Sequence, residues 1–214
     1  MSTAIRLAVS ATGFILLIAT AEAMARRWSL SAEVGRKLAH VWCGLLAAAL
    51  PFFLSFPAIA LLSVAFVPFM VSSRQFQLFP VIHSAERSTY GEVYFPIGVL
   101  LVALLVPHRN EYVFGVLVLA IADAAANIFG RRYGRRSYKI LSGHKTYAGS
   151  ATFLFSTIGL GMLVMSALGE VTAITAFAVT AAAAIVTIEE GLLGGGMDNV
   201  VLPVTAAAIL EMMT

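Results

Sequence analysis

An aspartate lies inside an apolar run of the chain, at Asp123, and Asn127 follows it four residues later. Residues four apart share one face of a helix, and Gly130 lies one further turn along, with Gly134 just beyond. A carboxylate at membrane depth is costly and usually marks a functional site. The alternative is an aspartate neutralised by a neighbouring arginine, beside glycines that let helices touch. The combination of acid, amide and glycines favours a site on this face.

A basic, glycine-punctuated segment, 131–146, follows and holds six Lys and Arg residues. Its last two residues, Lys145 and Thr146, stand where the next apolar run begins, with Gly149 close behind. A helix N-terminus that carries a lysine, a hydroxyl and a nearby glycine suits phosphate oxygens. A solvated loop beside anionic lipid accounts well for the arginines of this segment, but less well for Lys145 and Thr146. We therefore expect an anion site here.

Two further groups of polar residues lie at the ends of apolar runs. Arg36 and Lys37 precede His40 by four and three residues, so one helical face can carry two cations and an imidazole. Phosphate binding and simple anchoring stay equally open for this group. Around three glycines at 194–196 the chain offers oxygen ligands: Glu189, Glu190, Asp198 and Asn199. Such oxygens can bind a hard divalent cation, with surface acids on a flexible turn as the alternative.

These parts together are the ones that phosphoryl transfer requires. Oxygen ligands for Mg²⁺, a cluster of cations and a glycine-rich anion site suit a reaction whose catalysis is mainly positioning and charge stabilisation. The aspartate at 123 would hold the metal or activate a nucleophile, while the basic segment holds a polyphosphate. The elements that carry these residues must then gather them at one place.

Those elements are predicted to be membrane helices. The chain has 214 residues, of which 60% are hydrophobic and 12% are charged, against about 25% charged in soluble domains. Several apolar stretches approach the roughly 20 residues that a span requires. We predict an all-α, polytopic integral membrane helical bundle with seven or eight transmembrane helices. The eight stretches are 7–25, 38–55, 57–71, 93–107, 112–130, 148–168, 171–188 and 200–213.

The distribution of positive charge predicts how the spans are oriented. With eight spans, the loops 22–37, 72–91 and 131–146 hold 12 of the 14 Lys and Arg residues, and Arg6 and Arg109 fall on the other side. By the positive-inside rule these loops and the loop 189–199 are cytoplasmic, whereas both termini face outward. The net charge of +3 therefore reflects topology, and we expect no nucleic-acid partner.

The first apolar stretch and the AEAMA that follows imitate a signal peptide, but Arg26 and Arg27 come immediately afterwards and oppose export. We therefore expect a retained membrane anchor at 1–25.

The single cysteine, Cys43, excludes an internal disulfide and a multi-Cys metal site. Since repeats and long linkers are absent from the sequence, 1–214 is predicted to be one transmembrane domain.

The segment DAAANIFGRRYGRR…KTYAGS resembles the D-x-x-A-x-x-x-G-x-x-x-G…K-T-x-x-G-S/T signature of the CTP-dependent polyprenol kinase family. That family includes dolichol kinase, phytol kinase and a yeast-type diacylglycerol kinase. RKLAH at 36–40, GEVYFP at 91–96 and DNVVLP at 198–203 resemble further segments of phytol kinases and bacterial homologues, in the same order. The resemblance defines a kinase-like core at 33–203. One departure is His144 before Lys145, where dolichol kinases often have an aromatic residue.

The resemblance implies transfer of the γ-phosphoryl group of CTP to the hydroxyl of a lipid alcohol, with Mg²⁺ as cofactor. Asp123, Lys145 and Asp198 would be catalytic, and Asp123, Asp198 and Glu189 would hold the metal. The residues expected to contact the nucleotide or phosphates are Asn127, Gly130, Gly134, Arg131, Arg135, Thr146, Gly149, Ser150, Arg36, Lys37, His40 and Asn199. The alcohol would be phytol-, farnesol- or dolichol-like, or diacylglycerol, and membrane lipids would surround the protein.

Two other functions stay open. A phosphatidate cytidylyltransferase also uses CTP and Mg²⁺ in a polytopic membrane protein, although its usual K-D…H-G-G…D-R-x-D pattern is absent. A small lipid carrier or transporter would place ionisable residues near mid-membrane and often has two related halves, neither of which is evident. Small-residue faces such as Gly130 with Gly134 leave room for a homodimer. We expect a protein of the bacterial inner membrane with its active site on the cytoplasmic side.

Overall fold

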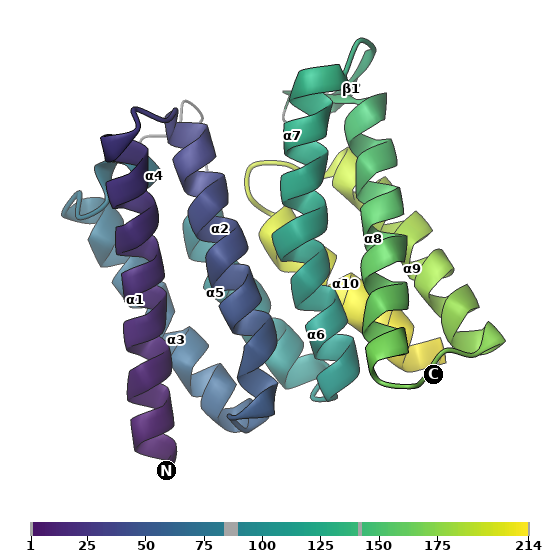
Figure 1. Ribbon diagram of the computed structural model, residues 1–214, viewed down its shortest axis with the longest axis horizontal. Coiled ribbons are helices and arrows are strands. Elements are labelled where there is room, and N and C mark those ends of the chain that lie inside the picture. The colour runs from purple at the N-terminus through teal and green to yellow at the C-terminus, as the bar shows by residue number, and fades with distance from the viewer. Residues whose placement is uncertain (1, 84–89, 141–142, 214) are drawn as a thin grey trace.

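The computed structural model describes residues 2–83, 90–140 and 143–213. They form a bundle of helices with one small hairpin, which confirms the predicted all-α membrane bundle (Figure 1). The helices are α1 (Thr3–Arg27), α2 (Ala32–Ala49), η1 (Leu50–Phe52), α3 (Phe56–Gln75), α4 (Pro80–His83), α5 (Gly91–Leu105), α6 (Arg109–Leu117), η2 (Val118–Ala122), α7 (Asp123–Tyr133), α8 (Tyr147–Ala167), α9 (Ala173–Leu192) and α10 (Asp198–Met213). The strands are β1 (Ser137–Ile140) and β2 (Gly143–Thr146).

Among the described residues, five helices are long and apolar enough to cross a membrane by length and composition. They are α1, α3, α8, α9 and the continuous helix Arg109–Tyr133, which consists of α6, η2 and α7. The apolar helix α5 has 15 residues, fewer than the roughly 20 of a full span. These helices support an integral membrane protein, and the count of seven or eight spans stays a prediction.

The hydrophobic core has two parts that meet at α6. The first is built mainly by α1, α2, α3 and α5, and the second mainly by α7, α8, α9 and α10. Tyr112 of α6 packs in the first part and Phe114 in the second, and both side chains are fully buried. The two groups of helices lie side by side in Figure 1. Both α6 and α10, which places Ala207 in the first part and Ala206 in the second, therefore couple the packing of the two parts.

The long helix Arg109–Tyr133 contains one turn of π-helix, η2, directly before Asp123. The backbone N–H of Asp123 donates to the carbonyl oxygen of Val118, five residues back. The carbonyl oxygen of Leu119 accepts a hydrogen bond from Nε2 of His40 on α2, at 3.0 Å. Such a turn often accompanies a functional site. Here it sets the direction in which the first residue of α7 points.

The basic segment 131–146 is more regular than the predicted loop. Half of it forms the antiparallel strands of a hairpin, β1 and β2, in which Tyr138 lies opposite Lys145 and Lys139 opposite His144. Neighbouring side chains of a strand point to opposite faces. Accordingly Lys145 is half-buried whereas Lys139 is exposed. The strand pairing thus decides which cations face the bundle.

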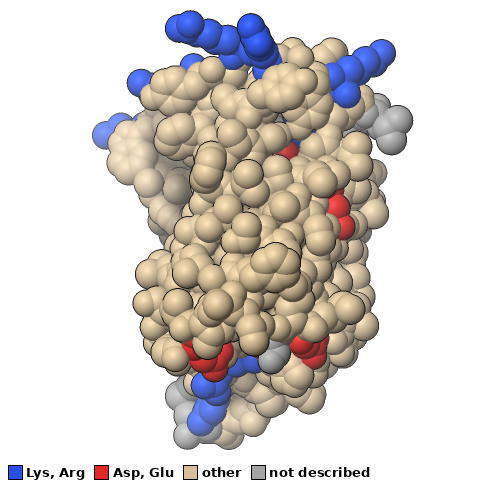
Figure 2. All heavy atoms as spheres, turned by 90° about the vertical axis from the view of Figure 1, so that its right-hand side faces the viewer, with Lys and Arg blue, Asp and Glu red and all other residues tan. Residues whose placement is uncertain are grey.

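Positive charge is concentrated at one end of the molecule. Figure 2 shows most Lys and Arg side chains at that end and a smaller group of charges at the other. Both chain termini lie at the less basic end (Figure 1). The arrangement agrees with the eight-span orientation. Which end faces the cytoplasm stays a prediction.

Candidate functional site

A polar cavity of about 660 Å³ lies at the basic end of the bundle. Its walls come from the start of α2, from α7, from the hairpin and the start of α8, and from the connection between α9 and α10. The residues predicted from sequence that line it are Arg36, Lys37, Asp123, Asn127, Gly130, Arg131, Lys145, Thr146, Gly149, Ser150, Asp198 and Asn199. Segments far apart in the chain are thus neighbours around one space.

Asp123 forms an ion pair across the helices. Its Oδ2 accepts a hydrogen bond from Nζ of Lys37 on α2, and the two side chains are 12% and 11% exposed. Asn127 lies one turn further along the same wall. The sequence left open that Asp123 is simply neutralised by a nearby arginine. In the structure a lysine, Lys37, neutralises it, and that lysine lines the same cavity. Asp123 is therefore both one partner of a structural ion pair and a candidate functional carboxylate.

Asp198 brings a second carboxylate to the cavity. It is the first residue of α10, and its charge interacts with that of Asp123. The connection before it turns through Gly195 and Gly196, whose φ angles of 70° and 97° favour glycine. Beside it, Asn199 donates from Nδ2 to the carbonyl oxygen of Gly91 at 3.0 Å, which anchors α10 to the start of α5. The turn and the anchor hold Asp198 in position.

The donor set fits a Mg²⁺ ion that is shared with a phosphate chain. Mg²⁺ is usually held by one or two carboxylates, with the remaining oxygens supplied by substrate phosphates and water. Asp123 and Asp198 provide two carboxylates on one cavity wall. In the described parts of the chain, three or more His, Cys, Asp or Glu side chains are nowhere gathered into a possible metal site. A Mg²⁺ ion at this cavity stays a prediction.

Lys145 is held by Glu190, which the sequence analysis named as a possible oxygen ligand but did not assign to the site. Its Nζ donates to Oε1 of Glu190 at 2.6 Å and also to the carbonyl oxygen of Glu190. Ser150 donates to Oε2 of the same carboxylate at 3.3 Å, and its hydroxyl lies 2.7 Å from that of Tyr138. The network joins the hairpin, α8 and α9. It places the lysine at the cavity without leaving its charge unpaired.

The glycines of the motif serve the crossing of α7 and α8. A Cβ atom on Gly130 would lie 2.8 Å from Oγ1 of Thr146 and 3.2 Å from Cα of Gly149. That hydroxyl already accepts from the backbone N–H of Gly149 at 3.1 Å and caps α8. Gly134 packs against Thr146 as well, although it does not line the cavity. The small-residue face that suggested a homodimer is thus covered within the chain, and a homodimer stays a prediction.

Arg36 is oriented by Glu33, an acid outside the predicted set. Its Nη2 donates to both carboxylate oxygens of Glu33 at 2.8 and 2.9 Å. Arg131 approaches the same carboxylate at 3.7 Å, and its side chain is 65% exposed. Two cations therefore flank one acid at the rim of the cavity. Arg131 has the freedom to turn toward a bound anion.

Three other predicted residues lie away from the cavity. His40 is engaged by the Leu119 carbonyl oxygen and stacks edge-on against the ring of Phe95, with centroids 5.3 Å apart. Glu189 precedes the acid that reaches the cavity, and it faces Thr205 of α10 instead. Arg135 is exposed just beyond α7. Their assigned roles in binding the nucleotide, phosphate or metal stay predictions.

The chain is similar to a phytol kinase from a Synechocystis strain, with 27% identity. The similarity covers 96% of this chain and 89% of that protein, so it extends beyond the predicted core at 33–203. No protein-family model matches the chain, and no solved structure is similar to it. The relative confirms the resemblance to the polyprenol kinase family that the motifs indicate.

Proposed function

We propose that this relative of phytol kinase is a membrane lipid-alcohol kinase that transfers the γ-phosphoryl group of CTP to a phytol-like alcohol. The name of the relative supports the kinase activity and the class of alcohol. The resemblance of the motif supports CTP as the donor. The observation that carries the proposal is that the two carboxylates and the cations of the motif segments line one cavity at the basic end of a membrane bundle.

The nucleotide side of the cavity is formed by the hairpin and the start of α8. Lys145 and the N-terminal turn of α8 direct positive charge and N–H groups toward the space. Arg131 lies at the rim with an exposed side chain. These groups suit the anionic oxygens of a triphosphate. A volume of about 660 Å³ is within the range of roughly 300–1,000 Å³ that is typical of ligand sites.

The acceptor side is formed by α2 and α7. We assign Asp123 to accept the proton of the attacking hydroxyl as its oxygen bonds to the γ-phosphorus and the bond to the leaving CDP breaks. Lys37 positions this carboxylate through the ion pair. Asp198, with Asp123, would hold Mg²⁺, which when bound neutralises charge that develops on the phosphates. The identity of the base and of the metal ligands is part of the proposal.

The charge distribution supports a cytoplasmic site. Most cations lie at the end of the bundle that contains the cavity (Figure 2), and cytoplasmic loops of membrane proteins are enriched in Lys and Arg. A nucleotide is supplied from that side, whereas a lipid alcohol is dissolved in the bilayer. We therefore propose an integral protein of the bacterial inner membrane that acts at its cytoplasmic face.

The test is to incubate the purified protein with Mg²⁺, phytol and CTP labelled at either the γ- or the α-phosphorus. We expect the γ label alone to appear in the lipid. Transfer of the α label to phosphatidate with release of pyrophosphate would instead show a cytidylyltransferase. If neither label reaches any alcohol of a panel that includes farnesol, a long polyprenol and diacylglycerol, the kinase assignment is wrong.

A further inference from the structure

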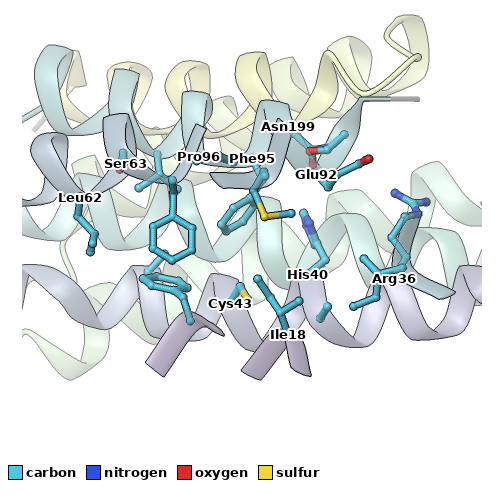
Figure 3. A pocket seen from close by; sticks show the side chains of 18 of the residues that line it. Ile18, Arg36, His40, Cys43, Leu62, Ser63, Glu92, Phe95, Pro96 and Asn199 are labelled. Atoms are coloured by element: carbon cyan, nitrogen blue, oxygen red, sulfur yellow. The ribbon is translucent and has the colours of Figure 1, made fainter. Parts of the chain in front are cut away.

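A second, apolar pocket lies beside the polar cavity, between α1, α2, α3 and α5 (Figure 3). One face of α2 forms its long wall, with Arg36, His40, Cys43 and Ala47 at helical spacing, and Leu50 of η1 continues it. From Arg36 to Leu50 this wall extends about 21 Å at 1.5 Å per residue. The hydrocarbon core of a bilayer is about 30 Å thick. The pocket therefore runs from the basic end far into the bundle.

The two ends of this pocket differ in chemistry. At the basic end it is lined by Arg36, Glu92 and Asn199, whereas Leu50 and Leu62 line the other end. Figure 3 shows Arg36, Glu92 and Asn199 toward one side and Leu62, beside the small hydroxyl side chain of Ser63, toward the other. Oε1 of Glu92 already accepts a hydrogen bond from Nη1 of Arg74 at 2.5 Å. An occupant therefore needs a small polar head and a long apolar body.

The pocket adjoins the polar cavity at its basic end. Arg36 and Asn199 line both spaces. Lys37, the residue after Arg36, pairs with Asp123, which lines the polar cavity. A head group at the basic end of the apolar pocket would therefore adjoin the cavity that contains the carboxylate we assign to the acceptor hydroxyl.

We propose that this pocket receives the single apolar chain of the acceptor alcohol end-on, with the hydroxyl at Arg36 and Asn199 and the chain running along α2 toward Leu50 and Leu62. The inference rests on the proposed kinase function and names its acceptor: one linear isoprenoid chain. Burying such a chain against apolar walls stabilises binding in proportion to the apolar surface that leaves water. The α2 residues that line the pocket then determine how long a chain the protein accepts.

The small volume of the pocket favours one chain over two. Its free space is about 80 Å³, against about 660 Å³ in the polar cavity, so even one chain must displace side chains of the wall. Met70 and Phe66 form part of the wall, and a methionine adapts its shape to irregular apolar surfaces. The wall can thus fit a methyl-branched chain. A second acyl chain, as in diacylglycerol, has no place beside it.

The test uses a plug and a matched control on the same helix. Cys43 lies midway along the pocket wall and is 7% exposed, so Cys43→Phe should block its deep half. Leu45 is 44% exposed on another face of α2, so Leu45→Phe adds an aromatic ring outside the pocket. The substrates are geraniol, farnesol and phytol, each with CTP and Mg²⁺.

We expect Cys43→Phe to lower the ratio of kcat/KM for phytol to that for geraniol by on the order of tenfold or more, since one methylene of misfit in an apolar pocket changes kcat/KM by about tenfold. Leu45→Phe should leave the ratio unchanged. A second variant, Leu62→Ala, lengthens the pocket and should shift preference toward longer chains. Equal loss for all three alcohols in Cys43→Phe, with no shift in Leu62→Ala, would overturn the proposal.

A binding measurement separates this proposal from the kinase assignment. A ligand that binds only the folded state raises the thermal unfolding midpoint, so phytol without nucleotide should raise the midpoint of wild type and Leu45→Phe but not that of Cys43→Phe. If phytol binds in this pattern and is never phosphorylated, the pocket stands and the kinase assignment fails. If phytol is phosphorylated but its binding is the same in all three proteins, the pocket proposal fails.

Discussion

The polar cavity and the apolar pocket share Arg36 and Asn199 but are built in different ways. The polar cavity is assembled at helix ends, from four segments that are distant in the chain, and its charges are held by partners such as Lys37 for Asp123. The apolar pocket lies mainly between the lengths of neighbouring helices, with Gly91 and Asn199 at its basic end, and its wall along α2 is one continuous helical face. Defined polar contacts thus fix the first space, and side-chain volume fixes the second.

This difference teaches where each kind of substitution should act. In the polar cavity, changing one charge without changing volume should alter the reaction, because electrostatic positioning depends on named partners. In the apolar pocket, changing volume without changing charge should alter only which alcohol is accepted. The predictions below test the polar side of the comparison, and the Cys43 and Leu62 variants test the apolar side.

The largest effect is expected from Asp123→Asn, which keeps size but removes the charge. Turnover should fall by on the order of a hundredfold or more, comparable to loss of a general base or a charge-stabilising group. The variant leaves Lys37 buried without its partner, so the unfolding midpoint should also fall. Lipid phosphorylation and thermal unfolding measure the two effects. Glu111→Gln, at the far end of the same long helix, is the matched control.

Adding Lys37→Met to Asp123→Asn separates the two roles of this pair. The double variant should recover most of the decrease in the thermal unfolding midpoint, because the unpaired charge of Lys37 is gone. It should stay inactive. Near-normal turnover in Asp123→Asn with a lowered midpoint would make Asp123 a structural partner only and would move the catalytic role to Asp198.

A smaller effect is expected from Lys145→Met, compared with Lys139→Met on the other strand of the hairpin. Lys145 lines the cavity and is half-buried, whereas Lys139 is exposed. Loss of one charged hydrogen bond, worth about 1.5–3 kcal/mol, should raise the KM for CTP by on the order of tenfold. Lys139→Met should change it by less than about twofold, since exposed charges contribute little. Equal effects would mean that the hairpin acts only through its total charge.

Replacing CTP by ATP as the phosphoryl donor should change turnover more modestly. A lysine and a metal ion treat the triphosphates of CTP and ATP alike, so discrimination depends on contacts to the base. We expect turnover with ATP to be several-fold lower than with CTP at equal concentration. Equal turnover would remove the cytidine assignment while leaving the phosphate site intact.

Two labelling variants test the orientation of the bundle, and their readout is labelling and not activity. With Cys43 replaced by Ala, cysteines at Ser137 and Val171 lie at the two ends of the bundle, and both positions are exposed. An impermeant thiol reagent should reach them from opposite sides of the membrane. Labelling of both from one side would contradict the eight-span orientation.

Much of the fold could be predicted because lipid imposes it. Apolar stretches of near-span length must be helical, and each of the eight stretches lies largely in helix. The hairpin was not predicted, since 131–146 has the glycine and charge content of a loop and its pairing depends on contacts with α8. The π turn was also missed, because no residue type marks it.

The candidate site shows the same division between local and tertiary information. Twelve of the predicted residues line one cavity. Burying polar side chains in lipid costs free energy, so the few that an apolar bundle contains are expected to gather at such a site. The choice of Glu189 over Glu190 had no basis in composition, since the two acids are adjacent. Helical phase in the sequence did not separate them, because both acids continue apolar rows at intervals of four. The structure shows that the row of Ala178, Ala182 and Val186, which Glu190 continues, is the buried one. Pairing of Lys37 with Asp123 joins residues 86 positions apart and lies beyond any local pattern.

The π turn at Val118–Ala122 gives the long helix two rotational phases, one before Asp123 and one after it. Each residue of an α-helix advances the chain by about 100°, so a single extra position turns everything downstream by that angle. Deleting one residue of the turn would rotate Asp123 and Asn127 together away from the cavity while α6 kept its own contacts. The number of residues in this turn is therefore as much a part of the site as their identity. An apolar side chain there can be exchanged for another, whereas a position cannot be removed.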